Sequence, residues 1–173
     1  MENIKTARTV IDLEKTVQRL MDSIDLLTGA AEMCRAEGPF LLRDFRTVGI
    51  KVPRQCGKSF EAVQRVIRNE KAIMICINDS LRKAISTNVS SEIMGRHPHG
   101  EPLKPHQIAR MYTVDEVIKA IRSVRNGQQD ILLEGANEII VDDSHWFFQL
   151  VRENQFYQWL WERQGADQKI LLL

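Results

Sequence analysis

The sequence predicts an α/β fold in which helices cover both faces of a mostly parallel sheet, a three-layer αβα core. Residues 72–77 are a continuous apolar run of strand length, which is typical of a strand buried on both faces of a parallel sheet. Residues 138–142 form a second such strand, and segments with helical spacing of apolar residues separate the predicted strands. This alternation indicates parallel β-α-β units with right-handed crossovers.

Length and composition indicate one ordinary globular domain. The 173 residues suffice for one domain with its own core and are too few for two, and 43% of them are hydrophobic. No apolar run approaches the roughly 18 residues of a membrane-spanning helix, so we expect no membrane partner. The three cysteines are odd in number and widely spaced, which disfavours a disulfide framework and a zinc site and favours a reducing cytoplasm.

A net charge of +1 neither favours nor excludes nucleic acid as a partner. Five arginines nevertheless crowd around one predicted loop, namely Arg43, Arg46, Arg54, Arg65 and Arg68. They form either a locally basic binding face or a solvated surface with one phosphate ligand among them. The sequence leaves both readings open.

The chain begins with an N-terminal helical segment, residues 1–38, which precedes the core at residues 39–173. Apolar side chains within residues 10–33 recur every three or four positions and therefore share one helical face. The triplet Glu37-Gly38-Pro39 ends that helix. The apolar face packs either on the sheet of the same chain or on another subunit, which makes this segment a candidate contact in a homo-oligomer.

Within the core we expect further strands at 47–52, 108–112 and 169–173 and a candidate strand at 131–133. Helices are expected at 59–69, 81–85 and 147–161. Thr113 and Glu116 form a capping box that begins another helix, which ends at Asn126-Gly127. Residues 88–107 are rich in proline and glycine and include three histidines, and we interpret them as an irregular surface loop rather than a metal site.

Residues 52–59, Val-Pro-Arg-Gln-Cys-Gly-Lys-Ser, follow a predicted strand and precede a predicted helix. They match the phosphate-loop pattern G-x-x-x-x-G-K-[ST] except that Val52 replaces the first glycine. Backbone N–H groups at such a helix N-terminus attract phosphate oxygens, and Gly57 lets the backbone approach them closely. Lys58 then reaches the β- and γ-phosphates, and the Ser59 hydroxyl binds Mg²⁺. The expected nucleotide-binding residues are Pro53, Arg54, Gln55, Cys56, Gly57, Lys58, Ser59 and Phe60.

Two carboxylates, Asp142 and Asp143, follow the strand at residues 138–142. The carboxyl ends of parallel strands meet at one edge of a sheet, so this strand end should lie beside the phosphate loop. Asp142 can hold Mg²⁺, and Asp143 can polarise an attacking water as a general base. The two motifs together predict a P-loop NTPase that uses ATP and Mg²⁺.

Both motifs resemble those of the ATPase domain of phage terminase large subunits. Residues 52–59 are similar to the deviant Walker A motif of that family, in which an Arg-Gln pair precedes x-G-K-[ST] and the first glycine is often missing. Residues 139–146, Ile-Ile-Val-Asp-Asp-Ser-His-Trp, resemble its Walker B segment, which commonly ends D-E-A-H before an aromatic residue. The resemblance spans residues 43–145 without the loop at 88–107. It includes no coupling motif and no nuclease domain, so we expect a stand-alone ATPase core.

The resemblance implies a role for each matching residue. Lys58 and Ser59 would bind phosphate and Mg²⁺, and Arg54 would act in cis as an arginine that stabilises the γ-phosphate. Asp142 would be the Walker B acid. Asp143 stands where the family has its catalytic glutamate and is one methylene shorter. The implied partners are the nucleotide and DNA or a phage or viral assembly protein, in the host cytoplasm if the protein is viral.

Two other functions remain open beside an ATPase of the additional-strand, terminase- or helicase-like class acting on DNA. One is a nucleotide-binding interaction or regulatory protein with weak hydrolysis, which Asp143 and the missing coupling motif favour. The other is a small nucleotide kinase, which fits the length. Against the kinase stand the paired acids beside Ser144-His145 and the lack of an arginine-rich lid.

Overall fold

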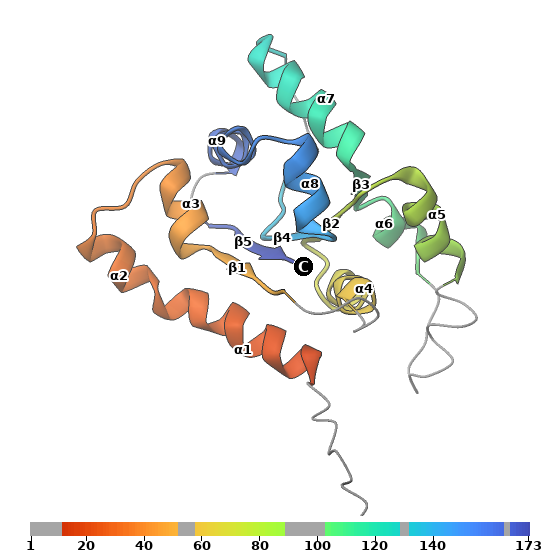
Figure 1. The fold of residues 1–173 in the computed structure, drawn as a ribbon, viewed down its shortest axis with the longest axis horizontal. Helices are drawn as coiled ribbons and strands as arrows, with labels where there is room; N and C mark the ends of the chain where they lie inside the picture. The colour runs from red at the N-terminus through yellow and green to blue at the C-terminus, as the bar shows by residue number, and fades with distance from the viewer. Residues whose placement is uncertain (1–11, 52–57, 89–102, 129–131, 165–166) are drawn as a thin grey trace, which may run out of the picture.

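The structure, a computed structural model, describes residues 12–51, 58–88, 103–128, 132–164 and 167–173 (Figure 1). Five strands form one sheet: β1 (Thr47–Gly49), β2 (Ala72–Cys76), β3 (Met111–Thr113), β4 (Glu138–Val141) and β5 (Lys169–Leu172). Their order is β1-β5-β4-β2-β3, and every neighbouring pair is parallel. The α/β class and the parallel sheet predicted from the sequence are confirmed.

Helices lie on both sides of this sheet, an arrangement compatible with three layers (Figure 1). They are α1 (Leu13–Leu26), α2 (Thr28–Met33), α3 (Pro39–Phe45), α4 (Lys58–Arg68), α5 (Asp79–Asn88), α6 (Pro105–Ile108), α7 (Val114–Arg125), α8 (Ser144–Leu150) and α9 (Glu153–Gln164). Successive strand side chains point to opposite faces, so Ile73 and Ile75 enter one apolar cluster whereas Met74 enters the other.

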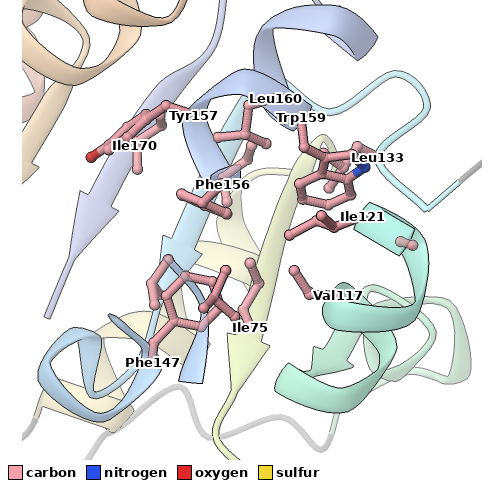
Figure 2. Close-up of a cluster of buried hydrophobic side chains, with 14 of the residues drawn as sticks. Ile75, Val117, Ile121, Leu133, Phe147, Phe156, Tyr157, Trp159, Leu160 and Ile170 are labelled. Carbon is pink, nitrogen blue, oxygen red and sulfur yellow. The ribbon is translucent and has the colours of Figure 1, made fainter. Parts of the chain in front are cut away.

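Side chains of α3, α7, α8 and α9 build the first cluster over one face of the sheet. Phe147 of α8 and Phe156 of α9 are fully buried there, with their rings edge to face and 5.0 Å apart (Figure 2). Val117 and Ile121 of α7 close the same cluster. Burial of these large side chains fixes α8, and α8 begins directly after the two predicted site carboxylates.

The opposite face is covered by α1 and α4. The apolar stripe of α1, formed by Val17, Met21 and Ile24, is buried in the second cluster together with side chains of the sheet. Lys169 of β5 also donates to the Asp25 carboxylate over 2.6 Å. Of the two packing arrangements that the sequence left open for this helix, α1 therefore uses its apolar face on the sheet of its own chain.

Several element boundaries differ from the sequence prediction. The helix expected at 147–161 is two helices, because Val151 adopts an extended conformation (φ −116°, ψ 123°) that buries its side chain in the first cluster. The strand expected at 108–112 is instead β3, Met111–Thr113, which is shorter and begins at residue 111. A short helix, α6, ends at Ile108, and β3 begins only after Arg110 has turned back to donate to the carbonyls of Val66, Asn69 and Ala72.

Two further expectations were wrong, and one helix was missed. Leu132 and Leu133 lie in a turn rather than a strand, and Gly135 there has a φ of +74°, which favours glycine. The end of the predicted irregular loop at 88–107 is helical in α6, while residues 89–102 lie outside the described part. Helix α3 was missed although its signal is present, since Pro39 occupies the first helical turn after Gly38.

The described members of the arginine crowd are engaged with carboxylates. The pairs are Arg43 with Asp44, Arg46 with Asp25, Arg65 with Glu138 and Arg68 with Glu14. The Arg65–Glu138 pair is buried at the amino edge of the sheet, where Asn69 also donates to Glu138 over 3.0 Å. These four arginines therefore form ion pairs, which favours a solvated surface over the locally basic binding face among the two readings that the sequence left open.

Candidate phosphate-binding site

All five strands are parallel, so their carboxyl ends lie along one edge of the sheet. β1 leads toward residues 52–57, and the described chain resumes at Lys58 as the first residue of α4. β4 ends at Val141 and is followed by Asp142 and Asp143 before α8 begins. The start of α4 and the end of β4 are thereby brought to the same edge.

Ser59 and Asp142 meet at this edge although they are 83 positions apart in the sequence. The Ser59 hydroxyl donates to Asp142, with Oγ 2.9 Å from Oδ2 and 3.2 Å from Oδ1. Asp142 is only 3% exposed, whereas Ser59 is half-buried at the start of its helix. The two predicted Mg²⁺ ligands are therefore in direct contact.

Burial raises the pKa of the Asp142 carboxyl above its ordinary value, and it outweighs the other influences. The hydrogen bond from Ser59 and the positive charge of Lys58 lower this pKa, whereas the neighbouring Asp143 carboxylate raises it. A cation placed beside this buried carboxylate would stabilise its charged form. Lys58 supplies part of that charge from the first turn of α4.

Asp143 stands in an unusual backbone conformation. Its φ of 56° and ψ of 59° are left-handed, and such a conformation costs on the order of 1–3 kcal/mol for a residue other than glycine. Asp143 occupies the N-cap of α8, yet its side chain makes no capping hydrogen bond. The half-buried Asp143 carboxylate therefore lies next to Asp142 and does not cap the helix. Residues with a strained backbone of this kind cluster at functional sites.

The oxygen donors of the Ser59 hydroxyl and the Asp142 carboxylate suit a hard cation such as Mg²⁺. Magnesium usually keeps several waters and takes one or two protein carboxylates together with substrate phosphates. Within the described ranges no group of three or more His, Cys, Asp or Glu side chains is placed to hold a metal ion. The two oxygen donors at this edge fit Mg²⁺ that would take its other ligands from water and phosphate oxygens.

Cys76 is a neighbour of the site that the sequence reasoning overlooked. It ends β2, beside β4, and its thiol is completely buried. Burial, followed by the nearby Asp142 charge, raises its pKa to about 12, so the thiol is neutral. The sequence contains no signal for this contact, because only the structure shows that β2 lies next to the strand that ends at Asp142.

The remaining predicted nucleotide-binding residues fall into two groups. Pro53, Arg54, Gln55, Cys56 and Gly57 lie outside the described residues. Phe60 is half-buried as the third residue of α4.

No protein-family model, curated protein or solved structure matches this chain. In the part of the chain that the structure describes, no helix is long and apolar enough to cross a bilayer.

Proposed function

We propose that this protein is a P-loop ATPase of the terminase- or helicase-like class that binds and hydrolyses ATP with Mg²⁺ and acts on DNA or a DNA–protein assembly. The observation that carries the proposal is the contact between Ser59 and Asp142. A hydroxyl at the start of a helix and a carboxylate at the end of a neighbouring parallel strand are the pair that binds Mg²⁺ in P-loop NTPases. Two separate sequence motifs had predicted that these two side chains would lie close together.

The strand order gives independent support. β5 lies between β1, which leads toward the predicted phosphate loop, and β4, which ends at Asp142. Thr47 of β1 and Ile139 of β4 both pair with Ile170 of β5. An additional strand between these two motif strands is the feature for which the additional-strand class of ATPases is named.

Each described residue then has a distinct task. Lys58 places its ammonium group at the helix N-terminus, where it attracts the β- and γ-phosphates. Ser59 and Asp142 would hold Mg²⁺, which neutralises charge developing on the transferred phosphoryl group. Asp143 accepts a proton from the attacking water as the general base. As part of the same proposal, Arg54 stabilises the γ-phosphate.

A second candidate is a nucleotide-binding interaction protein with weak hydrolysis. Asp143 favours it, because aspartate reaches one methylene less far than the glutamate of the resembling family and is fixed by a left-handed backbone. An attacking water would have to lie closer to the backbone than in that family. Binding would then be retained while turnover falls.

Steady-state ATP hydrolysis with and without duplex DNA separates these candidates. Wild type and Lys58→Ala should be compared, with Lys71→Ala as a matched control because Lys71 is an exposed lysine at the amino edge of the sheet. Turnover stimulated by DNA and lost in Lys58→Ala would support the ATPase. Tight ATP binding without turnover would support the interaction protein, and absence of ATP binding would refute both.

A further inference from the structure

The C-terminal half of α7 carries a basic surface formed by Lys119, Arg122 and Arg125. All three side chains are exposed, and no acidic residue occurs between positions 117 and 128. Among the described residues, no ion pair involves any of the three. They differ in this from the four described arginines near the predicted phosphate loop, Arg43, Arg46, Arg65 and Arg68, which are paired with carboxylates.

The fold holds this basic surface rigidly and away from the sheet. α7 begins with the Thr113–Glu116 capping box, and Val117 and Ile121 anchor its inner side in the first apolar cluster. At the other end, Arg163 of α9 donates to the Gln128 carbonyl over 3.4 Å. In Figure 1 the C-terminal half of α7 extends beyond α8 and α9, away from the sheet.

A hollow of about 250 Å³ lies beside the basic surface, between α7 and α9. Its polar lining includes Arg125 and the amide side chains of Asn154, Gln155 and Gln158. Glu162 also lines it, and its carboxylate accepts a hydrogen bond from the Gln158 amide over 2.6 Å. Amide side chains donate to phosphate and sugar oxygens in nucleic-acid complexes and therefore extend the basic surface chemically.

We infer that this surface, Lys119, Arg122 and Arg125 with the adjoining amides, binds the phosphate backbone of duplex DNA. Lys119 and Arg125 are six positions apart, about 9 Å along the helix axis, which matches two to three phosphates of one strand. A helix about 10–12 Å across also fits the wide groove of B-DNA. The inference deepens the proposed function, because it names the surface through which an ATPase of this kind holds DNA.

The test measures binding of a fluorescent 24-base-pair duplex by anisotropy, without nucleotide, across a salt titration. The triple variant Lys119→Gln, Arg122→Gln, Arg125→Gln should bind about tenfold or more weakly at 50 mM salt. Its slope of log affinity against log salt should fall by about 1.8–2.7, since each of the two to three lost phosphate contacts removes about 0.9. The control Arg19→Gln, Arg35→Gln, Lys71→Gln removes the same charge from exposed, distant positions and should stay within about twofold of wild type.

Equal binding by the two triple variants, or no DNA binding by wild type, would overturn the inference. A polyglutamate peptide of matching charge that binds as tightly as the duplex, and in the same α7-dependent way, would also overturn it in favour of an acidic protein partner. Circular dichroism of the α7 variant should be unchanged, because the three side chains are exposed. ATP titration of the same samples keeps the two proposals apart: failure of wild type to bind ATP contradicts the proposed function alone.

Discussion

Replacing Asp142 with asparagine removes a buried charge and keeps the size of the side chain. The carboxylate is 3% exposed, and burial is the main reason that its folded-state pKa lies above the ordinary value of 3.8. The asparagine oxygen can still accept from Ser59, so the weakening of that hydrogen bond costs only about 1 kcal/mol. Replacing buried ionic groups by neutral side chains of similar volume can gain about 1–4 kcal/mol, and we take the same range for this carboxylate. Without nucleotide and Mg²⁺, Asp142→Asn should therefore stabilise the fold at pH 8 by up to about 3 kcal/mol.

The pH dependence of this gain follows from the direction of the pKa shift. Protonated Asp142 contributes stability that is fully present below 3.8 and is lost as pH rises through its folded-state pKa. The difference in free energy of unfolding between Asp142→Asn and wild type should therefore shrink as pH falls from 8 toward 4. Taking the difference cancels the opposite contributions of carboxyls with lowered pKa, such as Asp79.

Urea denaturation followed by circular dichroism measures this difference at each pH. Asp167→Asn is the matched control, because Asp167 is exposed and should change stability by less than about 0.5 kcal/mol at every pH. A destabilised Asp142→Asn at pH 8, or a difference that does not vary with pH, would refute the view that this carboxylate is held buried for a cation. In the presence of Mg²⁺, Asp142→Asn should also bind ATP more weakly than wild type does.

Three further predictions concern turnover and the fold. Asp143→Asn should keep the affinity for Mg²⁺–ATP near that of wild type and lower kcat at least tenfold, because a general base acts mainly in the transition state; an unchanged kcat in a steady-state assay would reject that role. Arg54→Ala and Arg54→Lys should both keep ATP affinity within a small factor and lose most turnover, since lysine lacks the planar guanidinium fork of arginine. Wild-type turnover in Arg54→Ala would remove the residue from the catalytic set. Glu138→Gln should cost about 3 kcal/mol in urea denaturation, because Arg65 loses its nearest carboxylate and keeps Glu61, which is 3.9 Å away. Glu14→Gln at an exposed pair should cost less than about 1 kcal/mol. Equal costs at the two positions would show that the buried pair contributes no more than the exposed one.

The parts of the fold that the sequence predicted are those in which local signals and burial agree. The apolar runs that became β2, β4 and β5 are long enough to be recognised alone, and the Thr113–Glu116 capping box marked the start of α7. The spacing of apolar residues gave wrong helix boundaries where tertiary contacts determine the backbone conformation. Val151 continues the apolar spacing of a helix, yet its burial in the first cluster requires an extended backbone that divides α8 from α9.

The candidate site was predictable in its residues and less so in its surroundings. The phosphate-loop motif indicated Ser59, the acidic end of an apolar strand indicated Asp142, and parallel strands predicted that they would share an edge. The position of β5 between β1 and β4 could not be predicted, because strand order depends on packing between distant segments. Nor could the sequence show which cations were free, since pairing with carboxylates is decided in three dimensions.

Isothermal titration of ATP in the presence of Mg²⁺ tests the central claim, that Lys58 and Ser59 begin a phosphate-binding helix. The account predicts tight binding by wild type, a loss of at least about a hundredfold in Lys58→Ala, and no change in the control Lys71→Ala. The unfolding midpoint of Lys58→Ala should fall only slightly, because a side chain at the start of α4 contributes little to the core and its charge offsets only part of the buried Asp142 charge. Equal ATP affinity in wild type and Lys58→Ala would contradict the phosphate-site assignment.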